Sequence, residues 1–108
     1  MLRSVFLVAA FLLVAGCGQQ GLVCSESFAY GAAKSIVEKN LASPGSAKFA
    51  SLGDSSVKVR KTGACEYRVE SYVDSQNGFG ALLRTNFTIT VRGDAAEKSW
   101  QGSDLKTM

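Results

Sequence analysis

The stretch Tyr67-Arg68-Val69-Glu70-Ser71-Tyr72-Val73 decides the fold of this chain, because apolar and polar positions alternate along most of it. Successive side chains of a β-strand point to opposite faces, so the alternation predicts a strand with one buried and one solvated face. Such a strand belongs to an antiparallel sheet that is covered on one side only.

Two flanking segments repeat this alternation and extend the predicted sheet. Val57 and Val59 alternate with cations, and the apolar side chains of segment 86–92 alternate with polar ones. The dipeptide Thr62-Gly63 and the run Asn77-Gly78-Phe79-Gly80 are typical of turns. The sequence therefore predicts a three-stranded antiparallel meander. Segment 97–108 is expected to be either a fourth edge strand or a frayed tail.

A different period precedes the sheet and predicts one amphipathic helix over residues 25–42. Ser25 is the expected N-cap, and Pro44 ends the helix or starts a short further turn with Ser43 as its cap. The apolar stripe recurs at three- and four-residue spacing and comprises Phe28, Ala29, Ala32, Ala33, Ile36, Val37 and Leu41. Packing this stripe on the apolar sheet face gives a two-layer α+β domain over residues 25–108.

The N-terminus has the layout of a secretory signal peptide, with Arg3 followed by a short apolar run and small residues. The run is about half the roughly 20 apolar residues that a membrane-spanning helix needs. Its last five residues, Leu13-Val14-Ala15-Gly16-Cys17, resemble the lipobox of bacterial lipoproteins. An ordinary signal peptide and a membrane anchor are the alternatives.

The lipobox resemblance implies removal of residues 1–16, acylation of Cys17 and a short tether over residues 17–24. Two or three acyl chains hold a small domain on a membrane almost permanently. By analogy with Gram-negative lipoproteins, Gly18 after the lipidated cysteine favours the outer membrane, facing the periplasm. The expected location is thus the cell envelope.

The other two cysteines, Cys24 and Cys65, form an even pair in an exported chain, which predicts a disulfide. A small domain benefits from such a covalent link. Two free thiols are the alternative.

Composition argues against several functional classes. The net charge of the chain is only +3, and removal of Arg3 with the signal peptide makes it smaller. A nucleic-acid-binding domain is far more basic, so a nucleic-acid partner is not expected. The chain has no histidine, which leaves no zinc ligand set and neither a Ser-His nor a Cys-His pair. No cofactor motif is present, and we expect no metal, no cofactor and no enzyme activity.

Two motifs resemble those of a widespread family of small bacterial and phage domains. Segment 40–49 resembles the pattern L-x-S-P-x-S-A-K-F, and segment 72–87 resembles V-D-x-Q-N-x-F-G-A-x-x-R. The resemblance implies a shared architecture, without an activity to carry over. Each motif also has a plain structural explanation, with Asp74 and Gln76 bonding the backbone of the Asn77-Gly78 turn.

The polar sheet face carries the candidate binding residues, which are Arg60, Arg68, Tyr72, Arg84, Asn86 and Arg92. Arginine and tyrosine side chains suit a partner that bears carboxylates or phosphates. A solvated face with cross-strand Arg-Glu pairs is the alternative.

These patterns predict a membrane-anchored, non-catalytic binding module, with an inhibitory or exclusion role as one version. The expected partner is an envelope protein or a surface glycan. A structural or assembly subunit of an envelope complex is the alternative. A glycan-acting enzyme is a distant one, since it would need a carboxylate pair among Glu66, Glu70 and Asp74.

Overall fold

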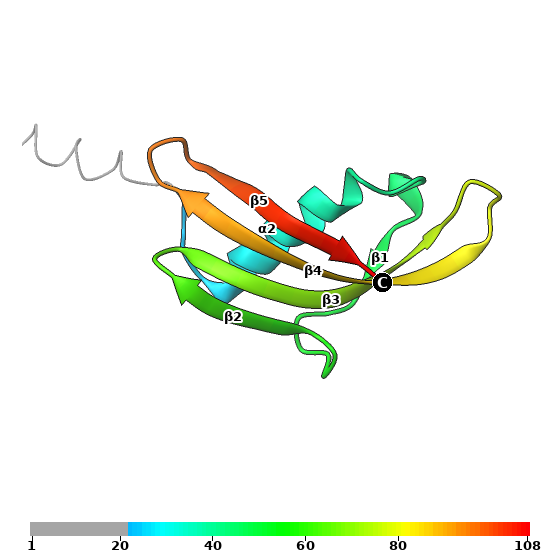
Figure 1. Ribbon diagram of the computed structural model, residues 1–108, viewed down its shortest axis with the longest axis horizontal. Coiled ribbons are helices and arrows are strands. Elements are labelled where there is room, and N and C mark those ends of the chain that lie inside the picture. Colours follow the sequence, from blue (N-terminus) through cyan, green and yellow to red (C-terminus); the bar gives the residue numbers. More distant parts are fainter. Residues whose placement is uncertain (1–21) are drawn as a thin grey trace, which may run out of the picture.

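A computed structural model describes residues 22–108 of the chain. The predicted signal peptide and the lipidation site at Cys17 lie outside these residues. The described part is an α+β domain in which one helix packs on an antiparallel sheet (Figure 1). No helix in residues 22–108 has the length and apolar character needed to cross a bilayer.

Helix α2 spans Glu26–Glu38, shorter at its C-terminal end than predicted. The Ser25 side chain caps it, because its hydroxyl accepts a hydrogen bond from the backbone N–H of Phe28 at 3.3 Å. After α2, the short 3₁₀ helix η1 spans Pro44–Ser46, but Ser43 makes no side-chain cap there. The predicted short turn that starts at Pro44 is thus present. In place of the predicted Ser43 cap, the Ser46 hydroxyl donates a hydrogen bond to the Ser43 carbonyl at 2.8 Å.

Within residues 22–108 the sheet has five strands and is larger than the predicted meander. They are β1 (Lys48–Phe49), β2 (Lys58–Gly63), β3 (Glu66–Gln76), β4 (Leu82–Asp94) and β5 (Ser99–Thr107). The last of them settles the open alternative for the C-terminal segment, which is an edge strand. Both β1 and β2 pair with β3, β3 pairs with β4, and β4 pairs with β5.

Strand β2 includes the dipeptide Thr62-Gly63, which the sequence predicted as a turn. The chain reverses at Ala64 and Cys65 instead, and Cys65 adopts a positive φ of 53°. Strand β1 has no counterpart in the prediction, because two residues are too few to show a period.

The core lies between α2 and the covered sheet face. Its fully buried large side chains are Val37, Val69, Val73, Phe87, Ile89 and Val91. Trp100 of β5 packs against this cluster, which explains why the C-terminal segment is a strand. The burial of alternate residues along β3 and β4 confirms the period-two interpretation of these segments.

The buried side of α2 differs from the predicted stripe at two residues, one that belonged to the stripe and one that did not. The Phe28 side chain is 56% exposed, whereas that of Tyr30, which was not assigned to the stripe, is 2% exposed. The Tyr30 hydroxyl lies 2.6 Å from the Ala50 carbonyl oxygen and 2.7 Å from the Ser71 hydroxyl. Burial raises the pKa of this phenol above its ordinary value. A buried polar tip needs such partners, and Tyr30 finds them on two other elements.

The two sequence motifs meet in space. Lys48 and Phe49 of β1 pair with Asp74 and Val73 of β3, and the Ser46 hydroxyl accepts a hydrogen bond from the backbone N–H of Gln76 at 2.9 Å. The turn that follows is bonded by Asn77, whose side-chain oxygen accepts from two backbone N–H groups at 2.9 and 3.0 Å. The prediction that Asp74 and Gln76 hold this turn is therefore wrong.

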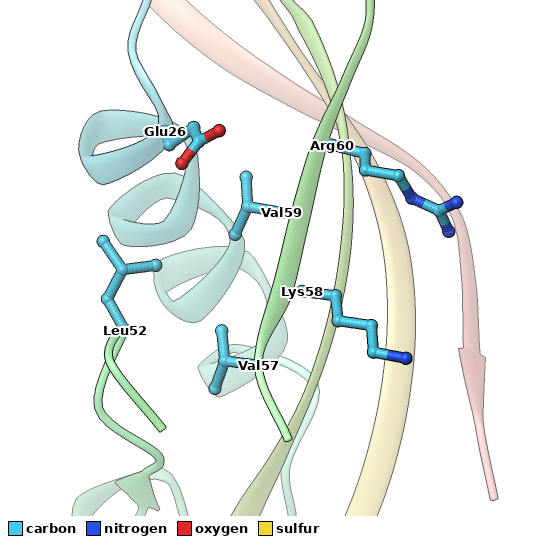
Figure 2. A pocket seen from close by; sticks show the side chains of 6 residues that line it. All are labelled: Glu26, Leu52, Val57, Lys58, Val59 and Arg60. Carbon is cyan, nitrogen blue, oxygen red and sulfur yellow. The ribbon is translucent and has the colours of Figure 1, made fainter. Parts of the chain in front are cut away.

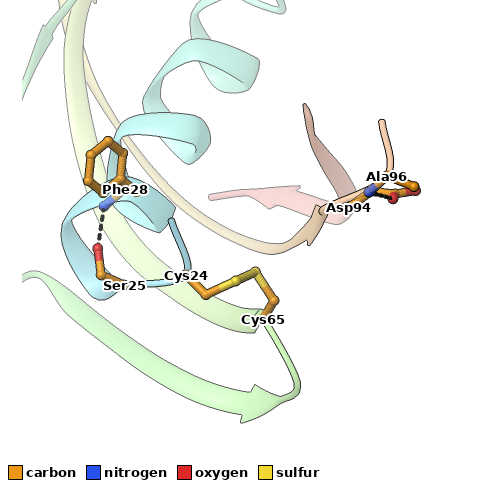
Figure 3. The surroundings of a disulfide bond; sticks show 6 residues. All are labelled: Cys24, Ser25, Phe28, Cys65, Asp94 and Ala96. Carbon is orange, nitrogen blue, oxygen red and sulfur yellow. Dashed lines mark hydrogen bonds between the residues drawn. A yellow bond between two sulfur atoms is a disulfide. The ribbon is translucent and has the colours of Figure 1, made fainter. Parts of the chain in front are cut away.

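A disulfide joins Cys24, just before α2, to Cys65, just before β3, with the two Cα atoms 5.1 Å apart (Figure 3). This confirms the predicted pairing. The backbone N–H of Gly93 donates to the Cys65 carbonyl at 2.8 Å, so β4 reaches the same place. A Cβ at Gly93 would lie 2.5 Å from the Cys65 sulfur, and only glycine allows this approach. We call this region the disulfide end.

Candidate functional site

All six predicted binding residues belong to the sheet face turned away from α2, which we call the outer face. The register pairs Arg60 with Arg68 and Tyr72 with Asn86, and it pairs Arg92 with Glu66. The structure thus places Arg60 beside Arg68, and Tyr72 beside Asn86. Arg92 lies at the other end of the strand pair.

A bonded cluster surrounds Tyr72. The guanidinium of Arg84 binds both carboxylate oxygens of Asp74, at 2.8 and 2.9 Å, and its central carbon lies 3.8 Å from the centroid of the Tyr72 ring. The Tyr72 hydroxyl donates to Asp54 at 3.4 Å. The hydrogen bond from Arg84 lowers the pKa of the Asp74 carboxyl, and hydrogen bonds from Ser56 lower that of Asp54. The paired carboxylate in turn raises the pKa of Arg84.

The arginines at the centre of the outer face are also paired within the domain. Arg60 contacts Glu70 at 3.2 Å, and Arg68 contacts Asp104 at 3.1 Å. The Arg68 guanidinium also donates to the hydroxyls of Thr88 and Thr90, both at 3.1 Å. A ligand anion would have to compete with these internal partners.

The three carboxylates considered for glycan chemistry do not form a pair. Glu66, Glu70 and Asp74 lie four residues apart on one strand, which separates neighbours by about 13 Å at ~3.3 Å per residue. Glycosidase carboxylates lie about 5–9.5 Å apart. Residues 22–108 also contain no group of three or more metal-ligating side chains.

An apolar surface that the sequence prediction did not single out lies where β3 turns into β4. Phe79 is 97% exposed, Leu82 67% and Leu83 52%. We call the segment from Asn77 to Leu83 the hairpin end. It extends beyond α2 at the opposite end of the sheet from the disulfide (Figure 1).

The hairpin end has a signal in the sequence. No charged residue lies between Asp74 and Arg84, and those two neutralise each other in the structure. Leu82 and Leu83 are adjacent in β4 and so face opposite sides of the sheet, which gives the hairpin end exposed apolar side chains on both faces as well as Phe79 in the turn. Exposed apolar groups of this size are candidates for interaction sites. The sequence prediction assigned Asn77-Gly78-Phe79-Gly80 to a turn and did not consider that Phe79 in it would be exposed.

A groove of about 470 Å³ forms the second notable surface, between α2 and the edge strand β2 (Figure 2). Val59 of β2 and Val57, just before β2, point toward the helix, and Leu52 points into the same space from the preceding loop. Glu26 in the first turn of α2 borders the groove, while Lys58 and Arg60 point away from it on the outer face. We call this the α2–β2 groove.

These observations define residues 22–108 as a small disulfide-linked α+β domain, with one α-helix on a five-stranded antiparallel sheet. Comparisons of the chain with protein-family models, with curated proteins and with solved structures return no match. The resemblance of the two motifs to a bacterial and phage family stays a prediction.

Proposed function

We propose that this chain is a lipid-anchored, non-catalytic binding module of the cell envelope. Acylation at Cys17 would hold it on the outer membrane, facing the periplasm, and the domain would engage an envelope protein or surface glycan there. By binding such a partner and blocking its surface, the domain would act as an inhibitory or exclusion factor.

The observation that carries this proposal is the separation between the point of attachment and the exposed apolar surface. The chain enters the domain at Cys24, which is bonded to Cys65 beside Gly93 of β4. From Gly93 to Leu82 the strand rises ~3.3 Å per residue, or about 35 Å in all. A tether at one end would leave Phe79 free to meet a partner at the other.

The energetics also favour the hairpin end as the principal contact. Burial of an apolar side chain such as Phe79 contributes ~1.5–3 kcal/mol, and aromatic residues are enriched among the residues that dominate interface energies. The outer-face arginines Arg68 and Arg84 already have acidic partners, so their contribution would be smaller. We assign them to the margin of the binding surface.

The proposal is tested by crosslinking in intact cells with matched phenylalanine variants. Phe79→Ser should abolish recovery of the partner, while Phe28→Ser, the same change at an exposed position of α2, should preserve it. Arg84→Glu should reduce recovery less than Phe79→Ser does. Recovery undiminished by Phe79→Ser would overturn the assignment of the hairpin end.

The anchor is tested separately by Cys17→Ser. This change should release the protein from membranes and abolish labelling by a fatty-acid probe. Unchanged membrane retention would contradict lipidation at Cys17.

A further inference from the structure

The edge strand β2 and the α2–β2 groove beside it form a surface with three properties that occur together. The outer edge of β2 pairs with no strand in the described part of the chain. The groove is open, with Leu52 39% exposed at its border. Val57 and Val59 form an apolar strip on its floor, half-buried against the core of the domain, and Glu26 gives its border a charge.

An open edge next to a helix-lined groove can accept an extended peptide as an additional strand. Main-chain hydrogen bonds to the β2 edge would supply part of the affinity. Alternate side chains of the added strand would enter the groove between Leu52, Val57 and Val59, and the others would lie on the outer face. The groove therefore selects apolar side chains at every second position.

The charges of β2 select the remaining positions. Lys58 lies opposite Glu70 in the register, and Arg60 binds the same Glu70 at 3.2 Å. One carboxylate thus lies next to two cations, and among residues 22–108 only Arg60 forms an ion pair with it. An acidic side chain on the added strand would lie next to these cations and balance the excess charge.

We propose that the β2 edge and the α2–β2 groove bind an extended segment of a partner protein in which apolar and acidic residues alternate. This rests on the proposed function of a binding module and names the chemistry of its partner. The peptide would add as an outer strand of the sheet, with its apolar side chains over Val57 and Val59 and its acidic side chains beside Lys58 and Arg60.

Arg60 and Lys58 have a competing role as solvated charges that keep a sheet edge from pairing at all. That role predicts no peptide binding of any pattern. The two accounts differ in what they expect of the groove. A purely protective edge does not need the exposed Leu52 beside the half-buried Val57 and Val59.

The test uses the full-length chain in detergent and a display library of random seven-residue peptides. We expect enriched sequences in which apolar and acidic residues alternate. A synthetic peptide of the enriched sequence should slow hydrogen exchange of the backbone amides in β2 and leave those of the hairpin end unchanged.

Charge-reversal variants complete the test. Lys58→Glu should weaken binding of the enriched peptide about tenfold, as expected when an opposite charge becomes a like one. The matched control Lys98→Glu, an exposed lysine in the turn between β4 and β5, should change it less than about twofold. Lys58 and Lys98 are both exposed, so neither variant is expected to impair folding.

Three results would overturn the proposal: no enrichment, enrichment without acidic residues, or protection of amides outside β2. None of these would touch the lipid anchor or the crosslinking at Phe79. Conversely, loss of the proposed envelope function would leave the peptide measurement unchanged, so the two proposals fail separately.

Discussion

The two ends of the sheet are held in different ways. At the disulfide end, a covalent bond, a backbone hydrogen bond and the close approach at Gly93 fix the start of α2 against β3 and β4. At the hairpin end, the bonds of Asn77 and the Asp74–Arg84 ion pair hold a turn whose large side chains face solvent.

This difference separates stability from recognition. Exposed segments with few buried contacts open at low free energy, whereas covalently fixed and buried segments open only when the domain unfolds. Substitutions at the disulfide end should therefore act on folding, and those at the hairpin end on binding. The predictions below begin with the largest effect, and the first and the last of them test this division.

The double variant Cys24→Ala with Cys65→Ala should lower the free energy of unfolding by about 4 kcal/mol, from the entropy of the loop that the disulfide closes. The loop spans a sequence separation of 41 residues. Denaturant unfolding of the full chain measures the loss. Phe79→Ser is the control and should change the unfolding free energy by less than about 0.5 kcal/mol, as is usual for an exposed site. Equal losses in the two variants would erase the distinction between the ends.

Tyr30→Phe tests the middle of the molecule, where the helix meets the sheet. Removing the hydroxyl takes away its hydrogen bond to the Ala50 carbonyl and its bond to Ser71, at a cost of about 1–3 kcal/mol. Tyr72→Phe should cost less, because its hydroxyl makes a longer bond of 3.4 Å to Asp54 and is only partly buried. A larger loss of unfolding free energy in Tyr72→Phe than in Tyr30→Phe would show that the outer face contributes more to stability than the contact between helix and sheet.

The Tyr30 phenol also makes the stability of the domain depend on pH. Burial raises its pKa, so its contribution to stability is complete below the pKa of tyrosine in the unfolded chain. That contribution decreases as the pH rises through the folded-state pKa. The Tyr30→Phe variant has no phenol to ionise at this position, so it should lose less unfolding free energy between neutral and alkaline pH than the unmodified chain does. Denaturant unfolding at both pH values measures the two losses.

Local patterns made much of the fold predictable. The period-two burial of β3 and β4, the Ser25 cap and the pairing of Cys24 with Cys65 follow from neighbouring residues or from a count of cysteines. These features need no knowledge of which distant segments meet, and the structure confirms them.

The features that were missed depend on contacts between distant segments. Tyr30 is buried because its hydroxyl finds Ala50 and Ser71, which lie 20 and 41 positions away. Phe28 is exposed although it neighbours Ala29, because one residue turns the helix by about 100° and places it on the solvent side. The helical period alone did not show where the buried stripe ended.

The candidate site divides in the same way. Alternation placed Arg68 and Arg84 on one face correctly, but their partners Asp104 and Asp74 depend on the register of the strands. The α2–β2 groove depends likewise on distant segments, because Glu26 of α2 and Leu52 of the loop line it together with Val59 of β2. Neither feature has a signature within one short segment.

The smallest expected effect concerns the ion pair at the base of the hairpin end. The Arg84 guanidinium lowers the pKa of the Asp74 carboxyl by hydrogen bonding, and Arg84→Gln should raise it toward its ordinary value. Carboxyl resonances followed by NMR across acidic pH measure this directly. Arg92→Gln is the matched control, because Arg92 lies opposite Glu66 at the far end of β3 and should leave the Asp74 titration unchanged.

The sign of the linked effect on stability follows from the lowered pKa. The ion pair stabilises the hairpin above the pKa of an unfolded aspartate, and the contribution is lost as the pH falls through the folded-state pKa of Asp74. The Arg84 side chain is 55% exposed and that of Asp74 is half-buried, so solvent weakens the ion pair. The change should therefore appear as faster hydrogen exchange around Asn77 in acid rather than as unfolding of the domain. If the whole domain instead unfolds at the pH where Asp74 becomes protonated, the hairpin end and the disulfide end are coupled. That result would contradict the division between an end that stabilises the fold and an end that binds.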